Sequence, residues 1–405
     1  MMPRPDDGSP TQEFDFRATT RLVVGAGTLG HLGELARELG GTRALVVSDP
    51  GIVAAGHTAA GLAALERAGL ETAVFSGFGE NPTTTQVEAG TAVAREFRPD
   101  VLVGLGGGSS MDCAKGINFL LCCGGRMQDY HGRGRATVSL LPAIAVPTTA
   151  GTGSETQSFA LITDETTGRK MACGDPRAAF RVAILDVLLT LTQPPRIAAL
   201  TGIDALSHAV ESLVSTAATT ASQVFSREAW RLLARNLPDL FAGDRFACAG
   251  DVAPQSISPQ EVAARSAVQL GAAWAGLAIE NAMLGAAHAL ANPLTAMHGV
   301  VHGQAVGLML PHVVRFNATV CSADYADLLR DVGIETAPAV AGARLAEWIA
   351  ALRAAAGLAG SFRELGIDAP DVPALAEAAA GQWTAAFNPV VVGSADLATL
   401  YDAAN

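Results

Sequence analysis

Basic residues, aromatic residues and paired cysteines are scarce in this chain. Charged residues make up 16% of the 405 residues, aromatic residues make up 5%, and 39 acidic against 27 basic residues give a formal net charge of −12. An excess of negative charge repels phosphate backbones and anionic membrane surfaces. The composition therefore argues against nucleic acid and against a membrane as partners.

The six cysteines show no C-x-x-C spacing, which argues against both a disulfide framework and a thiolate zinc site. Residues 1–16 are polar and acidic, and they lack the basic patch and apolar stretch of a secretory signal. We therefore expect reduced, mostly buried thiols and a cytoplasmic protein.

Residues 281–314 contain no Asp, Glu, Lys or Arg, and the stretch is long enough to span a bilayer. It also holds four histidines and two prolines, and polar groups of this kind are costly in hydrocarbon. We expect the stretch to lie in the interior of a folded protein rather than in a membrane.

Hydrophobic residues are abundant, at 49%, and 43 glycines and 20 prolines complete a composition typical of a compact α/β protein. Between residues 20 and 191, short apolar runs alternate with segments of helical period, which predicts a parallel sheet flanked by helices. The expected strands are 43–48, 72–75, 101–105, 143–146 and 182–185.

Beyond Pro194 and Pro195 the strand pattern stops, and Ala-rich segments of helical period continue, for example 203–215, 223–236 and 259–290. The sequence thus predicts a flexible tail over residues 1–16, an α/β domain over 17–192 and an all-helical domain over 193–405.

Two glycine-rich turns compete as the phosphate site of a nucleotide. Gly106, Gly107 and Gly108 follow an apolar run, and such a turn presents backbone N–H groups at the positive end of the next helix. Residues 25–30 match the dinucleotide-binding pattern G-x-G-x-x-G. Glycine also serves plain tight turns, so the spacing alone leaves both open.

Two further features suit a nucleotide. Asp49 ends a predicted strand and can accept hydrogen bonds from a ribose 2′-hydroxyl while repelling a 2′-phosphate, which favours NAD over NADP. An aspartate before Pro50 also starts ordinary turns. Residues 147–155, PTTAGTGSE, carry hydroxyls that can bind a cofactor or the loop's own backbone, among them those of Thr148 and Thr149.

A carboxylate and several imidazoles indicate a metal site in the helical half. Asp204 and His208 are four residues apart, so both lie on one face of a helix and can reach one cation. The charge-free stretch adds His288 and His302. One carboxylate and three neutral imidazoles leave room for a substrate oxygen on a divalent ion, and both zinc and ferrous iron accept these ligands.

On an unbroken helix His288 and His302 would be about 21 Å apart, since each residue adds roughly 1.5 Å. They can share an ion only if the helix is interrupted, and Pro293 and Gly299 provide such an interruption. His298, four residues before His302, is a rival ligand or a proton relay.

With these residues identified, the chain resembles the iron-containing (group III) alcohol dehydrogenase family. The resembling segments are 81–83 (NPT), 106–112 (GGGSSMD), 147–155 and 202–208 (GIDALSH), followed at the family's spacing by His288 and residues 302–312. The resemblance runs from about residue 16 to residue 317. It implies a Rossmann-like α/β amino-terminal domain and an all-α carboxy-terminal domain, an architecture shared with dehydroquinate synthase.

The resemblance also implies roles for individual residues. The metal ligands would be Asp204, His208, His288 and His302. The cofactor-binding residues would be Asp49, Gly107, Gly108, Ser109, Asp112, Thr148, Thr149 and Lys170. This favours the triple glycine as the phosphate site and assigns residues 25–30 to a tight turn.

One position departs from the family pattern. Many members have a second histidine four residues after the third ligand, often discussed as a proton relay, where this chain has Asn292. The catalytic proton route therefore involves Asn292 or a substitute, and His298 is the candidate substitute.

The expected function is NAD(P)-dependent interconversion of a small alcohol and its aldehyde or ketone. NAD is favoured over NADP, and Fe²⁺ is the family's metal, with Zn²⁺ as the alternative; the ion acts as a Lewis acid during hydride transfer. A lyase of the dehydroquinate-synthase kind and a non-catalytic nucleotide-binding regulatory protein remain alternatives. The resemblance also implies a homodimer.

Overall fold

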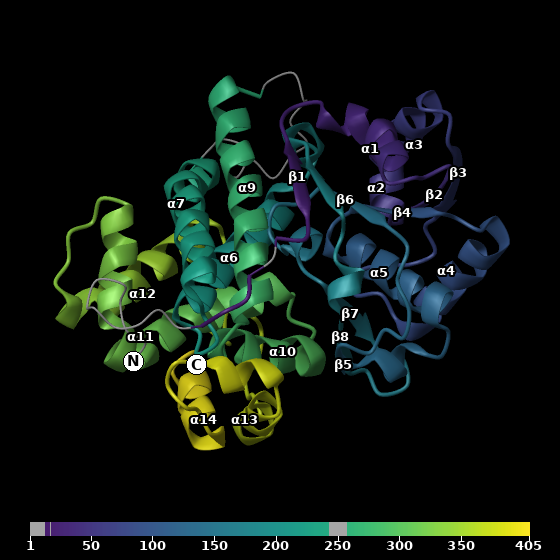
Figure 1. Cartoon of the computed structure of the whole chain (residues 1–405). Helices are drawn as coiled ribbons and strands as arrows, with labels where there is room; N and C mark the ends of the chain where they lie inside the picture. The colour runs from purple at the N-terminus through teal and green to yellow at the C-terminus, as the bar shows by residue number, and fades with distance from the viewer. Residues whose placement is uncertain (1–12, 17, 243–256) are drawn as a thin grey trace. The chain divides into compact units, whose positions relative to one another are not determined.

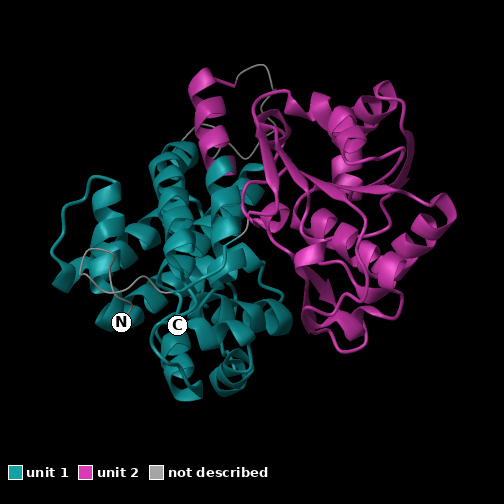
Figure 2. Ribbon diagram, in the orientation of Figure 1, with its two compact units in different colours: residues 1–17, 194–256, 270–405 teal, residues 18–193, 257–269 magenta. Residues whose placement is uncertain are grey.

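The computed structural model describes residues 13–16, 18–242 and 257–405 (Figure 1). The chain groups into two compact units, which Figure 2 distinguishes by colour. Unit 2 contains residues 18–193 and 257–269, and unit 1 contains residues 1–17, 194–256 and 270–405. Most of the expected amino-terminal tail, residues 1–12, lies outside the described residues, as do residues 243–256 of the helical half.

Unit 2 is built on a six-stranded sheet in which every pairing is parallel. Its spatial order is β1-β9-β6-β4-β2-β3. The strands are β1 (Arg21–Val24), β2 (Arg43–Val47), β3 (Glu71–Phe75), β4 (Val101–Gly106), β6 (Ala143–Pro147) and β9 (Val182–Leu185). The five predicted strands are confirmed, and β1 adds an edge strand that was not among them.

Helices cover both faces of this sheet, with α1 and α3 above it and α4 and α5 below it in Figure 1. The helices are α1 (Leu32–Glu38), α2 (Pro50–Ala54), α3 (His57–Arg67), α4 (Thr84–Phe97) and α5 (Gly108–Cys123). Every residue of β4 is buried, as expected for a strand covered on both sides. The predicted α/β architecture with a parallel sheet is confirmed.

The chain reverses direction across the sheet between β2 and β4. From β2 it continues to β3 on one side, and from β4 it continues to β6 and β9 on the other. Ligands of open α/β sheets bind beyond the carboxyl ends of the strands at such a switch point. The carboxyl ends of the adjacent strands β2, β4 and β6 carry Asp49, the triple glycine and Thr148.

Unit 2 also contains a smaller sheet, which the sequence did not predict. Its strands fall between β4 and β9 in the sequence. It has the order β5-β8-β7, and β7 and β8 pair antiparallel. Its strands are β5 (Gly132–Arg133), β7 (Phe159–Thr163) and β8 (Lys170–Gly174). Short 3-10 turns complete unit 2: η1 (Thr28–His31), η2 (Met127–Tyr130), η3 (Ser154–Thr156), η4 (Pro176–Ala178) and η5 (Val187–Thr190).

Helices are the regular secondary structure of the described part of unit 1, which confirms the predicted all-α half. Its helices are α6 (Pro195–Val214), α7 (Thr220–Ala242), α9 (Pro259–Ala282), α10 (Ala286–His298), α11 (His302–Asp331), α12 (Pro338–Ala355), α13 (Val372–Ala380), η7 (Trp383–Phe387) and α14 (Ser394–Asp402). The start of α9, up to residue 269, groups with unit 2.

Two helix boundaries differ from the sequence prediction. The helix expected over 259–290 ends at Ala282, where Met283 adopts a left-handed backbone with φ of +65°. Pro293 does not interrupt the next helix, since it lies inside α10; Gly299, with φ of +67°, ends it. A left-handed residue costs little at glycine, so Gly299 alone makes the predicted interruption.

Helices α6 and α9 are long and apolar enough to cross a membrane, but 78% and 67% of their most apolar windows are buried inside the protein. That burial is typical of core helices. The charge-free stretch at 281–314 runs from the end of α9 through α10 into α11, and most of its side chains are buried, which confirms the interior location expected for it. Cys113, Cys173 and Cys321 are buried free thiols, as expected; Cys122 and Cys123 are free and half-buried, and Cys248 lies outside the described residues.

Candidate metal centre and nucleotide-binding edge

Three imidazoles from three helices converge on one carboxylate oxygen in unit 1. Oδ1 of Asp204 lies 3.4 Å from Nε2 of His208, which is one turn later on α6. It lies 3.5 Å from Nε2 of His288 on α10 and 3.8 Å from Nε2 of His302 on α11. The three imidazoles thus present the same ring nitrogen toward one point.

These distances suit a shared cation better than direct hydrogen bonds. Four ligands at about 2.0–2.2 Å from a tetrahedral ion are roughly 3.3–3.6 Å apart, which is close to the spacings found. Oδ1 of Asp204 and Nε2 of His288 are buried and have no hydrogen-bond partner, and buried polar atoms are normally satisfied. Asp204, His288 and His302 form a group whose ligand atoms are close enough together to hold a metal ion; His208 is not in that group, although its Nε2 lies 3.4 Å from the same Asp204 oxygen. The residues therefore fit a divalent metal.

The electrostatics of the cluster also favour a cation. Although burial opposes ionisation, the neighbouring His208, His288 and His302 hold the pKa of Asp204 well below its usual range. Burial likewise lowers the pKa of His288, but the neighbouring carboxylates of Asp204 and Glu211 outweigh it and raise that pKa to about 9. Positive charge is thus favoured at the centre of the buried carboxylate and the imidazoles. A metal ion can bind at this centre by displacing protons.

Glu211 orients His288 and is a site residue that the sequence did not predict. Its Oε2 lies 2.5 Å from Nδ1 of His288, so an Nδ1–H donated to this carboxylate leaves the lone pair of Nε2 for a metal. The side chain is buried. Glu211 is three residues after His208 and seven after Asp204, on the same helical face, and that spacing was the available signal.

The cluster is open on one side. The side chains of Asp204, His208 and His288 are 5–8% exposed, whereas that of His302 is 29% exposed. A centre enclosed by three ligands and accessible beside the fourth leaves room for a small molecule to approach.

The two candidate proton-transfer residues lie elsewhere on α10. Nδ2 of Asn292 donates to Oε1 of Gln382 over 3.0 Å. His298 is the last residue of α10 and is exposed. Because the helix ends between His298 and His302, the expected one-turn relation between them does not hold, and the group able to hold a metal does not include His298.

At the sheet edge of unit 2, the triple glycine allows close packing around the turn from β4 into α5. Gly106 has φ of +147°, and a side chain there would collide with Ser110. A Cβ on Gly108 would lie 2.9 Å from Thr152. Gly107, by contrast, has room, since its Cβ would meet Thr149 at 3.5 Å. The turn thus leads into α5, where the first backbone N–H groups have no intrahelical acceptor.

Asp49 lies next to this turn. Its Oδ1 accepts hydrogen bonds from the backbone N–H groups of Gly51 and Ile52, 3.0 and 3.2 Å away, and caps α2. Its Oδ2 accepts from the Ser110 hydroxyl over 3.1 Å. Both interpretations of Asp49 therefore coexist: it starts a turn, and it places negative charge beside the glycine turn.

The hydroxyls of Thr148 and Thr149 are buried without a hydrogen-bond partner. Orphaned hydroxyls are uncommon in folded proteins, so these two are suited to a ligand. Thr148 is joined to the glycine turn by its backbone N–H, which donates to the Gly106 carbonyl over 2.9 Å. The two loops thus form one edge.

The remaining predicted cofactor residues are held by partners within unit 2. Ser109 Oγ accepts from the Asn81 backbone N–H over 3.1 Å, and Lys170 Nζ donates to Asn81 Oδ1 over 2.9 Å. Asp112 is buried, and its Oδ1 accepts from the Ser154 hydroxyl over 2.7 Å. Burial raises the pKa of Asp112. Asp112 thus connects α5 to the PTTAGTGSE loop.

The competing turn at residues 25–30 carries an internal anion. The carboxylate of Asp186 accepts the backbone N–H groups of Gly27 and Leu29 over 2.9 and 3.0 Å. These are the donors that a phosphate would use. The turn is therefore already satisfied, in agreement with its assignment to a tight turn.

Comparison with known proteins gives one consistent result. Residues 19–187 match the family described as iron-containing alcohol dehydrogenase, and residues 198–405 match its C-terminal family. The chain is 34% identical to 1,3-propanediol dehydrogenase of Citrobacter freundii, covering 96% of this chain and 98% of that protein. It is 32% identical to NAD-dependent methanol dehydrogenase of Bacillus methanolicus, covering 93% and 96%.

A solved structure agrees with these relatives. The crystal structure of a 1,3-propanediol oxidoreductase has a TM-score of 0.90 and 32% identity, covering 97% of this chain and all of that one, 100%. These matches cover both the half with the parallel sheet and the helical half with its converging acid and imidazoles. The chain belongs to the iron-containing alcohol dehydrogenase family.

Proposed function

We propose that this protein is a metal-dependent, NAD-linked alcohol dehydrogenase or aldehyde reductase that acts on a small alcohol or the corresponding aldehyde or ketone. The observation that carries the proposal is the convergence of His208, His288 and His302 on Oδ1 of Asp204 within 3.8 Å. Family membership supports the same reaction class, since the relatives are named as dehydrogenases of methanol and of 1,3-propanediol. The name of the methanol dehydrogenase states that it depends on NAD.

The residues of the chain would divide the work between binding and orientation. Asp204, His208, His288 and His302 would hold the metal, and Glu211 would keep the His288 proton on Nδ1. A divalent ion held there would supply Lewis acidity to a substrate oxygen, and bound NAD would supply the hydride donor or acceptor. The burial of three ligands keeps water from their side of the centre.

NAD is the proposed cofactor because Asp49 brings a carboxylate to the edge that carries the glycine turn, where a 2′-phosphate would be repelled. Gly107, Gly108, Ser109, Thr148, Thr149 and Lys170 would complete its site, with Asp112 fixing the loop. Two orphaned threonine hydroxyls at this edge support the assignment.

Iron is proposed as the native metal from the family's description, and the ligand set also accepts zinc. The related lyase function is disfavoured because the matching family and relatives are dehydrogenases and reductases. A non-catalytic regulatory role is disfavoured because all four ligand side chains are retained and converge. A cytoplasmic homodimer completes the proposal.

Metal analysis of the purified protein, combined with an NADH-coupled panel of small alcohols and aldehydes, tests this function directly. We expect about one equivalent of a divalent metal per chain, from the centre formed by Asp204 and the three histidines, and net NADH formation with at least one simple alcohol. Stoichiometric metal and bound NAD without turnover would favour the regulatory role, and elimination of phosphate without net NADH would favour the lyase.

A further inference from the structure

The first turn of α10 is capped by side chains from other parts of unit 1. Gly285 precedes the helix and offers no side-chain cap. Oδ1 of Asn388 accepts from the Ala286 backbone N–H over 3.2 Å, and Oε1 of Glu211 accepts from the Ala287 N–H over 2.7 Å. Backbone N–H groups at the start of a helix lack intrahelical acceptors, so these two side chains satisfy them in place of a local cap.

The absence of a side chain at residue 285 makes this arrangement possible. A Cβ on Gly285 would lie 3.0 Å from Oε1 of Glu211 and 3.1 Å from Oδ1 of Asn388. Real Cβ atoms rarely approach so closely, and a larger residue would push both acceptors away from the helix. Gly285 therefore belongs to the capping arrangement.

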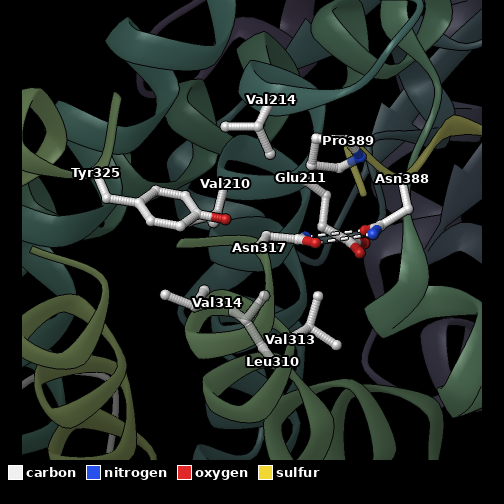
Figure 3. Close-up of a pocket in the computed structure, with 11 residues that line it drawn as sticks. Val210, Glu211, Val214, Leu310, Val313, Val314, Asn317, Tyr325, Asn388 and Pro389 are labelled. Atoms are coloured by element: carbon white, nitrogen blue, oxygen red, sulfur yellow. Dashed lines mark hydrogen bonds between the residues drawn. The ribbon is translucent and has the colours of Figure 1, made fainter. Parts of the chain in front are cut away.

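Asn388 is itself fixed by a reciprocal amide pair, drawn in Figure 3. Asn317 Nδ2 donates to Asn388 Oδ1 over 2.9 Å, and Asn388 Nδ2 donates to Asn317 Oδ1 over 2.8 Å. Asn388 Nδ2 also donates to the Val390 carbonyl over 2.7 Å. With both donors engaged, its oxygen is directed at Ala286.

Glu211 and the amide pair border a small cavity with a mostly apolar lining, in which Val210, Val214, Leu310, Val313 and Val314 surround the polar groups (Figure 3). Hydrogen bonds to a carboxylate are strong where water is excluded, and an unpaired carboxylate is costly there. Glu211 is buried, so its two acceptor oxygens depend on the two donors that they meet.

His288 is the third residue of α10 and shares its carboxylate with the cap. Oε1 of Glu211 holds the helix at Ala287, and Oε2 lies 2.5 Å from Nδ1 of His288. One carboxylate thereby fixes the position of the helix end and the orientation of the ring. A displacement of this turn would move Nε2 of His288, now 3.5 Å from Oδ1 of Asp204.

We propose that Glu211 and Asn388 are positioning residues, which together cap α10 from outside the helix and so preorganise His288 for the metal. This inference rests on the proposed function, because it concerns one of the proposed metal ligands. Neither residue is proposed to contact the substrate or the metal.

The variant Glu211→Gln tests the shared carboxylate with little change in shape. Its amide has one acceptor and one donor end, whereas both partners of Glu211 are donors. If the oxygen faces Ala287, the amide N–H faces Nδ1 of His288, and the ring must move its proton to Nε2 to accept that bond. If the oxygen faces His288, the cap at Ala287 is lost. Either outcome weakens the metal site.

Asn388→Ala removes the second cap and leaves Glu211 with His288. Asp331→Asn is the matched control for Glu211→Gln. It turns another largely buried carboxylate of unit 1 into an amide, but this carboxylate pairs with Arg227 and Arg231. It should lower thermal stability without changing the metal site.

The measurements are the affinity for Co²⁺ and Zn²⁺ in competition with a chelator, the visible absorption of bound Co²⁺, and the thermal midpoint of the metal-free proteins. We expect Glu211→Gln to lose about 10- to 100-fold in metal affinity, with an altered cobalt spectrum, and Asn388→Ala to lose less. Asp331→Asn should keep both the wild-type affinity and the wild-type spectrum.

The outcomes separate this inference from the function on which it rests. If the wild-type protein binds metal and Glu211→Gln binds it equally well with the same cobalt spectrum, the positioning role is wrong and the proposed function stands. If all three variants lose affinity in proportion to their loss of thermal stability, the role of Glu211 is structural only, and the inference is overturned. If the wild-type protein binds no metal, the proposed function fails, and this inference fails with it.

Discussion

Asp204 and His302 meet across the helical unit, with Oδ1 of Asp204 3.8 Å from Nε2 of His302. The two residues come from α6 and α11, and the turn at Gly299 brings the start of α11 back toward α10. His302 is also the most exposed of the four proposed ligands. It can therefore be removed with less effect on the core than its partners.

We expect His302→Ala to lose metal and turnover while keeping its fold. Loss of a ligand should lower the metal affinity by more than the loss of a residue that only hydrogen-bonds a ligand, which costs about 10- to 100-fold. Metal content after dialysis, NADH formation and the thermal midpoint of the metal-free protein are the measurements. Full turnover in a metal-free His302→Ala protein would refute the metal assignment.

Gly107→Ala should abolish or strongly weaken NADH binding without unfolding the protein. A Cβ at residue 107 meets only Thr149, at 3.5 Å, so the fold tolerates it, but the methyl group narrows the approach to the glycine turn. Gly30→Ala is the control from the other glycine-rich turn, since a Cβ there meets nothing within 4 Å. Fluorescence titration with NADH compares them, and an effect on the control alone would move the nucleotide site to residues 25–30.

His298→Ala tests the proton route left open by Asn292. If the exposed imidazole of His298 carries the proton, its removal should change the pH dependence of kcat. Metal content should stay at the wild-type level. A pH profile that coincides with that of the wild-type protein would discard His298 as the relay.

Glu155→Gln should change how stability depends on pH. Burial raises the pKa of Glu155 from 4.5 to about 7, so between these values the folded state holds a proton that the unfolded state has released. Stability therefore falls as pH rises through this window, by roughly 1–3 kcal/mol for such a shift, and the glutamine variant lacks this contribution.

The measurement for Glu155 is the thermal midpoint at about pH 4 and about pH 8, on either side of the window. We expect the wild-type protein to lose more stability than the variant between the two. Identical losses would show that Glu155 does not retain its proton in the folded protein.

Much of the fold follows from local patterns in the sequence. The continuous apolar run of β4 and its glycine turn predict a buried parallel strand, because only a strand covered on both faces avoids polar positions. The small sheet of β7 and β8 was missed, since its pairing depends on the loop between two strands rather than on either strand alone. Met283 follows the end of α9 with a left-handed backbone. This helix end could not be predicted, because residues other than glycine rarely adopt that conformation.

The site was predictable to the level of ligand types, but not of their partners. Asp204 and His208 are recognisable by helical spacing, and His288 and His302 by their place in a charge-free stretch. The bond between Glu211 and His288 joins residues that are 77 positions apart, and no local pattern encodes it. Pro293 looked like a helix breaker, yet it is buried inside α10, where packing offsets the roughly 3 kcal/mol that a proline costs in a helix.

Asp186 gives the first glycine turn a permanent internal counter-ion. The two glycine-rich turns on this sheet have similar glycine content, but the backbone N–H groups of one already donate to a carboxylate. That carboxylate, Asp186, is 159 residues from Gly27 and 157 residues from Leu29. Whether a glycine signature recruits a nucleotide thus depends on a distant acid as much as on the glycines themselves. Deleting that acid is a route to creating a second anion receptor in this protein.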